Sequence, residues 1–534
     1  MAEETRGADA VRVLIADELS PAAVRIFSDR GVAADVRTGL SKDELIEAVA
    51  DYDGIAVRSA TKVTEKVIGA ARRLKVVGRA GIGVDNIDIR AATARGVIVM
   101  NTPHGNSITT AEHAISLLMA LARQIPAADR STQAGKWEKS RFMGVEVTGK
   151  TLGIVGCGNI GSIVADRAQG LRMRVIAFDP FLTAARAVEL GVEKVELEQL
   201  LARADFITLH TPLTDKTRNI IDEAAIARMK KGVRIVNCAR GGLIDEAALL
   251  AGLEAGHVAG AALDVFLEEP AKANALFGRD DVICTPHLGA STSEAQENVA
   301  VQVAEQMCDY LLKGAIENAI NFPSISAEEA PLIRPFVRLA EQLGSFAGQL
   351  TRSPIRRVQI EFAGSLAEMN TKAMTSAALA GLMRPLLAEV NMVSAPVIAR
   401  DRGMQVDVTA QTKRGVYDNY IRVNVVTDNQ ERSVGGTVFS DGRPRIIQIK
   451  GINMEAELGP HMLYVTNRDK PGFIGALGTT LGKAGVNIAT FHLGRHERGG
   501  DAIALVEVDE ALPAQVLEAV RALEHVVQAQ PLEF

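Results

Sequence analysis

The pattern of apolar and polar positions changes character several times along the chain. Over the first hundred residues, short apolar runs such as 11–16 and 55–57 alternate with stretches that carry helix-start signals. Ser41, for example, forms a capping box with Glu44 and should open a helix. Strands that alternate with helices indicate a parallel sheet covered by helices. We therefore expect an α/β domain at the N-terminus.

The same alternation returns from residue 151 to about residue 290, and each apolar run there ends in polar residues. The later strands are expected at 206–209, 234–237, 261–265 and 282–284. Long apolar-faced helices are expected on both sides of this region, at 106–124 and from a capping box at Ser291 to a stop at Gly314. They would carry the chain out of the first domain and back, giving two lobes with a hinge.

From about residue 325 the pattern of apolar and polar positions changes. Residues 332–455 mix helical runs with alternating strands such as 421–426 and 446–449, and the last 75 residues read as βαββαβ, a ferredoxin-like module. The expected fold class is thus α/β, with a doubly wound Rossmann-type domain inserted in a flavodoxin-like domain, followed by an α+β domain and the ferredoxin-like domain. The expected boundaries are 1–104 with 293–324, then 105–292, 325–456 and 459–534.

The stretch TLGIVGCGNIG, residues 151–161, organises the second domain. Gly156, Gly158 and Gly161 form G-x-G-x-x-G between a buried strand and a helix, and Asp179 follows at the end of the next strand. The glycines allow a tight turn, close approach of a pyrophosphate and close helix packing, while the acid suits the adenosine ribose. A carboxylate there also repels a 2′-phosphate, which favours NAD over NADP. The alternative is a glycine-rich turn that binds nothing.

The first domain has a glycine pair of its own, Gly81 and Gly83. It lacks the third glycine, because position 86 is Asn, and no acid follows at the required distance, so we interpret it as a backbone loop. Arg58 and Arg79 stand at strand ends in this domain. They are either surface charges or a clamp for phosphate or carboxylate, since ligands of such sheets bind at the carboxyl ends of the strands.

Three polar residues follow successive strands of the second domain, namely Arg240, Glu269 and His287. Oxidation of a hydroxy acid needs a base, a partner that sets the base's pKa, and a cation for the carboxylate. His287 can be the base, Glu269 can bond its other ring nitrogen, and Arg240 can hold a carboxylate with two hydrogen bonds. A lone histidine is more often structural, but three such residues at one sheet edge indicate a catalytic set.

Composition narrows the class of protein. The chain has 534 residues and a formal net charge of −6, which indicates neither nucleic acid nor an anionic membrane as a partner. No apolar run is long enough to span a bilayer, and the acidic start MAEETRGADA does not resemble a signal peptide. The four cysteines form no C-x-x-C pair, so we expect no metal site and a reduced, cytoplasmic protein.

At these residues the sequence resembles the D-isomer-specific 2-hydroxyacid dehydrogenases, and among them the long forms. The matching stretches are VGRAGIGVDNID, GIVGCGNIG, VNCARGGLIDE, AALDVFLEEP and TPHLGAST. The order of domains matches too, with an intervening domain and an ACT domain at the C-terminus. The resemblance implies NAD-dependent oxidation of 3-phospho-D-glycerate to 3-phosphooxypyruvate, the first step of the phosphorylated serine pathway.

The resemblance also carries roles onto numbered positions. It implies His287 as base and Glu269 as its partner. The implied substrate-binding residues are Arg58, Arg79, Asn106 and Arg240, together with Trp137, Lys139 and Arg141 of a loop that reaches a neighbouring subunit. The implied NAD contacts, besides the three glycines, are Asn159, Ile160, Asp179, Thr211, Cys238, Asp264, His287, Gly289 and Ala290.

The ACT domain of similar enzymes binds L-serine, and the matching positions are Asn467, Asp469 and Asn487. The resemblance thus implies a homodimer or homotetramer that L-serine regulates. Three alternatives stay open. The chain could act on another D-2-hydroxy acid, including 2-oxoglutarate reduction as a side activity. It could be a non-catalytic NAD-sensing protein, or its C-terminal 210 residues could serve only assembly, with Asp469 and Asn487 as turn residues.

Overall fold

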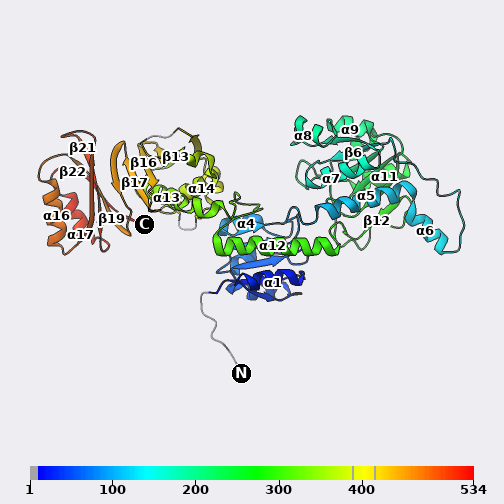
Figure 1. The fold of residues 1–534 in the computed structure, drawn as a ribbon, viewed down its shortest axis with the longest axis horizontal. Coiled ribbons are helices and arrows are strands. Elements are labelled where there is room, and N and C mark those ends of the chain that lie inside the picture. The colour runs from blue at the N-terminus through cyan, green and yellow to red at the C-terminus, as the bar shows by residue number, and fades with distance from the viewer. Residues whose placement is uncertain (1–9, 388–389, 414–415) are drawn as a thin grey trace, which may run out of the picture.

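The computed structural model describes residues 10–387, 390–413 and 416–534, so the N-terminal decapeptide discussed above lies almost wholly outside the described residues. Four sheets follow one another along the chain, and each belongs to a separate lobe in Figure 1. We call these lobes the first to the fourth domain. Among the described residues, no helix combines the length and the apolar character needed to cross a bilayer.

The first domain is built from residues before 101 and from a helix that returns to it. Its elements are β1 (Arg12–Ile15), α1 (Pro21–Asp29), β2 (Ala33–Val36), α2 (Lys42–Ala48), η1 (Val49–Asp51), β3 (Gly54–Val57), α3 (Glu65–Ala70), β4 (Val76–Arg79), α4 (Ile89–Arg95), β5 (Ile98–Met100) and α12 (Ser293–Lys313). The parallel sheet has the order β2-β1-β3-β4-β5, which is the flavodoxin-like order that we predicted. Gly78 lets α12 approach closely, because a Cβ there would lie 2.3 Å from Met307 Sδ.

The second domain is a seven-stranded parallel sheet with helices on both faces. Its elements are α5 (Ser107–Arg123), α6 (Ile125–Gln133), β6 (Thr151–Val155), α7 (Asn159–Gly170), β7 (Arg174–Phe178), α8 (Ala184–Glu189), β8 (Glu193–Lys194), α9 (Leu197–Arg203), β9 (Phe206–Leu209), α10 (Glu223–Arg228), β10 (Val233–Asn237), α11 (Glu246–Glu254), β11 (Val258–Leu263) and β12 (Val282–Cys284). The order β12-β11-β10-β9-β6-β7-β8 is that of a Rossmann-type sheet and confirms the prediction.

One strand of this sheet differs from its predicted position. We expected it at 261–265, but β11 begins at Val258 and ends at Leu263. Gly260 lies inside the strand, where a Cβ would come within 2.8 Å of Asp281 O and 2.9 Å of Leu121 Cδ1. The glycine therefore serves close packing rather than a turn.

The third domain has a mixed six-stranded sheet with the order β14-β13-β15-β16-β17-β18, in which only β13 and β14 run parallel. Its elements are α13 (Glu329–Gln349), β13 (Ile355–Gly364), η2 (Ser365–Glu368), α14 (Thr371–Met383), α15 (Ala395–Asp401), β14 (Gln405–Gln411), β15 (Asn419–Thr427), β16 (Glu431–Val438), β17 (Pro444–Ile449) and β18 (Ile452–Ala456). Glycines let α13 and α14 touch backbone to backbone, because a Cβ at Gly344 would lie 2.0 Å from Ala378 O.

The fourth domain has the βαββαβ order that we predicted. Its elements are β19 (His461–Arg468), α16 (Phe473–Lys483), β20 (Ile488–Arg495), β21 (Asp501–Val508), α17 (Ala514–Arg521) and β22 (Val526–Glu533). The strands form an antiparallel sheet with the order β20-β21-β19-β22, and the two helices lie together on one side of it in Figure 1.

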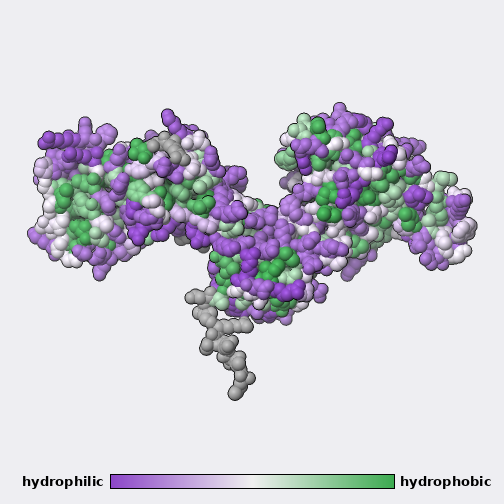
Figure 2. All heavy atoms as spheres, viewed as in Figure 1, coloured by the Kyte–Doolittle hydropathy of each residue, from purple (hydrophilic) through white to green (hydrophobic). Residues whose placement is uncertain are grey.

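The hydrophobic cores divide the molecule differently from the sheets. One cluster of buried residues runs from Phe27 and Met307 in the first domain, through Leu343 in the third, to Tyr464 and Leu505 in the fourth. Separate clusters fill the second domain, and the first and fourth domains each have a further cluster of their own. Hydrophobic areas also reach the visible surface of each lobe in Figure 2. The second domain is thus joined to the rest mainly by polar contacts and by the two segments in which the chain passes between domains.

Candidate active site

The glycine loop lies at the switch point of the second sheet, between β6 and α7. Gly156 has φ +92°, and a Cβ there would lie 2.6 Å from His210 O and 3.0 Å from Thr211 N. A Cβ at Gly161 would lie 2.1 Å from Gly156 O, whereas Gly158 faces open space. No side chain caps the start of α7. Free N–H groups beside an open glycine fit a pyrophosphate.

Asp179 closes the other side of this loop. One carboxylate oxygen accepts a 2.8 Å hydrogen bond from the amide of Cys157, and the other accepts a 2.7 Å bond from the amide of Phe181. The acid from β7 is therefore placed directly against the glycine turn from β6, as the ribose-binding role requires. Asn159, at the start of α7, reaches toward the first domain with Nδ2 3.5 Å from Pro103 O.

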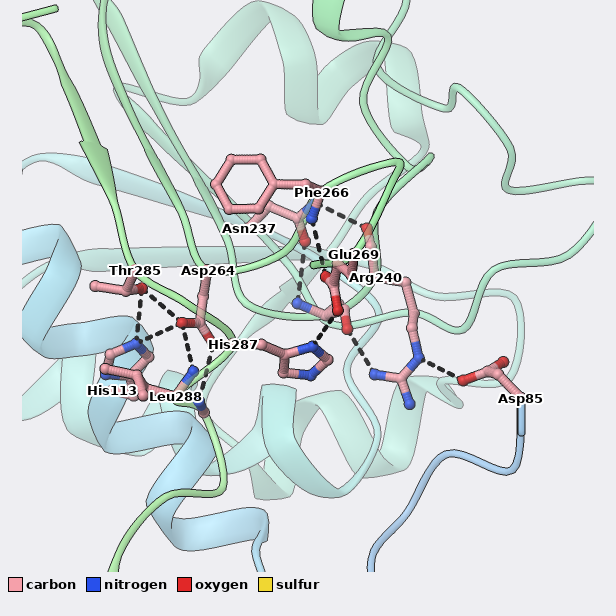
Figure 3. Close-up of polar contacts among 12 residues, drawn as sticks. Asp85, His113, Asn237, Arg240, Asp264, Phe266, Glu269, Thr285, His287 and Leu288 are labelled. Atoms are coloured by element: carbon pink, nitrogen blue, oxygen red, sulfur yellow. Dashed lines mark hydrogen bonds and ion pairs between the residues drawn. The ribbon is translucent and has the colours of Figure 1, made fainter. Parts of the chain in front are cut away.

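His287 and Glu269 form the expected hydrogen bond, with His287 Nδ1 2.7 Å from Glu269 Oε2 (Figure 3). Glu269 Oε1 also accepts from the amide of Phe266 at 3.0 Å. Burial raises the pKa of Glu269, but the bonds from His287 and Phe266 outweigh burial and leave that pKa below its ordinary value. Glu269 is thus an ionised acceptor that fixes the ring, and the histidine ring is half-exposed, so its Nε2 can meet a ligand.

Arg240 spans the boundary between the first and second domains. Its Nε lies 3.0 Å from Asp85 Oδ2, its Nη1 donates to Ala239 O at 2.6 Å, and a Cβ at Gly83 would lie 1.8 Å from its Nη2. Figure 3 shows the guanidinium on the same side as the ring of His287. The sequence predicts only a backbone loop at Gly81 and Gly83 of the first domain. In the structure this loop lies against the guanidinium of Arg240 from the second domain.

Arg79 is a partly buried cation without an ion pair among the described residues. Its Nε has no hydrogen-bond partner, and its Nη1 reaches only Ala80 O at 3.3 Å. Burial, with the positive charges of Arg240 and Arg58, lowers the pKa of Arg79 to about 10. The group is still charged at neutral pH, and a buried unpaired charge is costly. Three guanidinium groups that repel one another indicate that an anion belongs between them.

Asn106 adds a second unpaired polar atom. It precedes α5 but does not cap it, and its buried Oδ1 has no partner in the described part of the chain.

Cys238 is also buried, and burial followed by the charge of Asp264 raises the pKa of its thiol. Cys238 and Asp264 follow β10 and β11, so both lie at the carboxyl edge of the sheet.

The tryptophan loop lies away from this cluster within one chain. Trp137 is 86% exposed, and the loop follows α6 at the outer end of the second domain (Figure 1). Arg141 is held by Glu138 and by Asp280, with its Nη2 2.6 Å from Asp280 Oδ2. Lys139 is exposed as well. The structure of a single chain therefore does not bring these residues to Arg240.

The three positions singled out in the fourth domain have partners of their own. Asn467 is buried, with Nδ2 3.0 Å from Arg468 O and an unpaired Oδ1. Asp469 accepts from Arg495 at 2.7 Å, and Asn487 Nδ2 lies 2.7 Å from Asp509 Oδ2. Both Asp469 and Asn487 stand in loops next to a strand end.

Sequence reasoning missed two groups beside the site. Asp85, which pairs with Arg240, lies in the matching stretch VGRAGIGVDNID, but the sequence assigned it no role. His113 lies in the middle of α5, where a histidine gives no signal, yet its Nε2 is 3.2 Å from Asp264 Oδ1. The Asp85 contact depends on how the first and second domains are arranged, and the His113 contact depends on how α5 packs within the second domain.

Comparisons with known proteins agree with this geometry. Residues 115–289 match the family described as D-isomer specific 2-hydroxyacid dehydrogenase, NAD binding domain. Residues 332–450 match the D-3-phosphoglycerate dehydrogenase intervening domain, and residues 461–525 match the ACT domain.

Full-length relatives and solved structures extend the comparison. The chain is 44% identical to a D-3-phosphoglycerate dehydrogenase from Synechocystis over 95% of this chain and 92% of that one. It is 42% identical to one from Archaeoglobus fulgidus over 98% of this chain and 100% of the other. A glyoxylate reductase structure from Paecilomyes thermophila is 31% identical, with a TM-score of 0.55 over 58% of this chain and 98% of that chain. The chain therefore belongs to the D-3-phosphoglycerate dehydrogenases, within the family of D-isomer-specific 2-hydroxyacid dehydrogenases.

Proposed function

We propose that the chain oxidises 3-phospho-D-glycerate to 3-phosphooxypyruvate with NAD, the first step of serine synthesis by the phosphorylated route. The names of the full-length relatives support the substrate. NAD, when bound, supplies the acceptor for the hydride that leaves C2. The observation that carries the proposal is the Glu269–His287 pair beside a group of cations in which Arg79 forms no ion pair with any described residue.

The proton of the substrate hydroxyl goes to His287. Its Nδ1 donates to ionised Glu269, so Nε2 is left as the acceptor on the exposed side of the ring. The carboxylate of Glu269 then stabilises the imidazolium as it forms. Arg240 holds the substrate carboxylate beside the ring and polarises the reacting C–O bond.

The phosphate of the substrate is proposed to bind to the first domain. Arg58, Arg79 and Asn106 offer donors there, and two of these side chains carry a buried polar atom that lacks a partner. An unphosphorylated acid would leave this cation group without a full counter-charge, which argues against lactate or glycerate. For NAD, we propose the contacts that the family pattern implies besides Gly156, Gly158, Gly161 and Asp179, which are Asn159, Ile160, Thr211, Cys238, Asp264, His287, Gly289 and Ala290.

The test is NADH formation from NAD at alkaline pH with 3-phospho-D-glycerate, D-glycerate and D-lactate in parallel. We expect turnover on the phosphorylated acid only. His287→Ala and Arg240→Ala should each lower kcat/KM by about 10²- to 10⁴-fold while NADH still binds. Turnover on an unphosphorylated acid alone would refute the role of the arginines. Unchanged turnover in either variant would refute catalysis by this set and favour an NAD-sensing protein.

For the fourth domain, we propose that an amino acid, L-serine, binds near Asn467, Asp469 and Asn487 and regulates the enzyme. The match to the ACT domain supports amino-acid regulation. Carboxylate and amide groups suit an ammonium and a carboxylate, and Arg495 beside Asp469 adds a cation for the latter. Asp469→Ala in the full-length chain should keep activity and lose the response to serine. If the activity of the full-length chain does not respond to serine, the fourth domain serves only assembly.

For assembly, we propose a homodimer or homotetramer in which Trp137, Lys139 and Arg141 reach the neighbouring site. The exposure of Trp137 supports this, since a large apolar side chain in water favours a partner surface. Trp137→Glu should shift the mass measured by light scattering to that of a smaller species and raise KM. An unchanged mass would contradict the loop's role.

A further inference from the structure

The loop that carries His287 has a backbone conformation that must be held from outside. His287 has φ +55°, a left-handed conformation that side chains other than glycine adopt at a cost. Its amide donates to Asp264 O at 2.9 Å and to Thr285 O at 3.0 Å. The ring position that the proposed reaction needs therefore depends on the groups that stabilise residues 285–289.

Most of that stabilisation comes from one buried carboxylate. Asp264 is 0% exposed, and its Oδ1 accepts from the amide of Leu288 at 2.7 Å and from Thr285 Oγ1 at 2.5 Å. Its Oδ2 accepts from the amide of Gly289 at 2.8 Å. The two amides that follow His287 are thus both tied to a single side chain, and Figure 3 shows this group next to the ring of His287.

The carboxylate itself is held by α5. His113 Nε2 lies 3.2 Å from Asp264 Oδ1 and 3.3 Å from Thr285 Oγ1, and its side chain is 19% exposed. Burial raises the pKa of Asp264, but the bonds from His113 and Thr285 and from the Leu288 amide leave that pKa below its ordinary value. The carboxylate is therefore ionised, and it can accept only from a ring that carries its proton on Nε2. One turn earlier on α5, Thr110 Oγ1 donates to Gly289 O at 2.8 Å.

We infer that His113 is a positioning residue for His287, acting through the carboxylate of Asp264, and this inference rests on the function proposed above. α5 thereby braces the 285–289 loop at both ends. Because α5 also leads in from the first domain, the placement of the ring is tied to the helix about which the two domains join. A change in the conformation of the 285–289 loop would move Nε2 of His287 away from the reacting hydroxyl without removing any group that binds NAD.

A metal ion is the rival explanation for this cluster. His113, Cys238 and Asp264 each have one potential ligand atom, and these atoms lie within 4.8 Å of one another. The two oxygens of Asp264, however, already accept four hydrogen bonds from the chain. Burial also raises the pKa of the Cys238 thiol, which opposes the thiolate that a metal would need. The geometry is that of a complete hydrogen-bond network.

The test compares three variants of the full-length chain. His113→Leu removes the donor, and His113→Gln keeps an N–H near the position of Nε2. The matched control is His257→Gln, because His257 is also half-buried in the second domain and its ring Nε2 lies 3.0 Å from Met229 O, a backbone group outside the 285–289 loop. For each protein we would measure kcat and KM with 3-phospho-D-glycerate, the NADH dissociation constant by fluorescence, and hydrogen exchange of the Leu288 and Gly289 amides.

We expect His113→Leu to lower kcat by about 10- to 100-fold, as a displaced catalytic group does, with NADH affinity within about threefold of the parent. The two amides should exchange faster in His113→Leu alone, and His113→Gln should recover most of kcat. Unchanged kcat in His113→Leu, or an equal loss in His257→Gln, would overturn the inference. If the parent chain oxidises no 2-hydroxy acid, the proposed function fails. Exchange then decides the inference by itself, since faster exchange only in His113→Leu supports the brace and unchanged exchange refutes it.

Discussion

The second domain and the body formed by the other three domains are held together in different ways. The hydrophobic clusters of the second domain are confined to that domain, whereas the first, third and fourth domains share one continuous cluster that includes Met307, Leu343 and Tyr464, in addition to the separate clusters of the first and fourth domains. Between the two bodies, Arg240 and Asp85 form a polar contact that water can reach. Packed cores resist deformation and exposed ion pairs do not. The difference indicates that the second domain moves as a unit against the other three.

This comparison changes how regulation from the fourth domain would reach the site. Phe346 of α13 meets Tyr464 of β19 edge to face, with ring centroids 5.7 Å apart. The same cluster continues through Ile333 and Ala315 to α12, which packs against β3 and β4 of the first sheet. A ligand on the fourth domain would therefore act on a body that includes the first domain, and would affect the second domain through the joint between the two bodies.

The largest expected effect breaks the shared core. Tyr464→Ala should destabilise the three-domain body by about 3 kcal/mol, because it empties a fully buried aromatic site. In calorimetry we expect two transitions, of which only the one that belongs to this body moves to lower temperature. Tyr464→Phe is the matched control and should leave both in place, since the hydroxyl has no partner among the described residues. A single transition that shifts as a whole would show that the molecule is one cooperative unit.

The next effect concerns Arg79, which lies in the three-domain body and faces the joint. Arg79→Met should raise KM for 3-phospho-D-glycerate by about 10- to 100-fold, because charge-assisted bonds to the substrate are lost. The transition of the three-domain body should stay in place or rise, because a partly buried cation that forms no ion pair among the described residues is replaced by an apolar chain of similar length. Arg90→Met, at an exposed position of α4, should change neither quantity. A marked drop in thermal stability of Arg79→Met would mean that the cation is paired in solution.

Acid should separate the two bodies further. The pKa of Asp264 is lowered in the folded protein, so its ionised form contributes stability above the ordinary carboxyl pKa, about 3.9, and that contribution is lost as the pH falls through the lower folded value. The transition of the second domain should therefore lose this part of its stability below about pH 4. In Asp264→Asn that transition should start lower at pH 7, and the gap to the parent should narrow on acidification. A gap that stays constant with pH would contradict the charge of Asp264.

The same two bodies explain what the sequence could and could not predict. The glycine loop, Asp179 and the pair of Glu269 with His287 each follow from a local pattern, because strand ends of one parallel sheet meet at one edge. The contact of His113 with Thr285 joins residues 172 apart in the sequence, and its helix gives a pattern of packing only. The shared core was also not predicted. Its members are ordinary apolar residues of three domains, and nothing in Met307 or Tyr464 states which domain it will face.

The smallest expected effect tests the polar joint itself. Asp85 accepts from Arg240 at 3.0 Å, with a side chain that is 76% exposed, so the pair is worth little to stability. It does occupy the cation that the substrate carboxylate is proposed to bind, and substrate must displace it. Asp85→Asn should therefore lower KM by about two- to fivefold with kcat and both melting transitions unchanged. Asp88→Asn, which removes a nearby negative charge but keeps the oxygen that caps α4, is the matched control that should leave KM alone. A higher KM in Asp85→Asn would mean that Asp85 draws Arg240 into place across the joint instead of competing for it, and the two bodies would then be held together by the same contact that prepares the site.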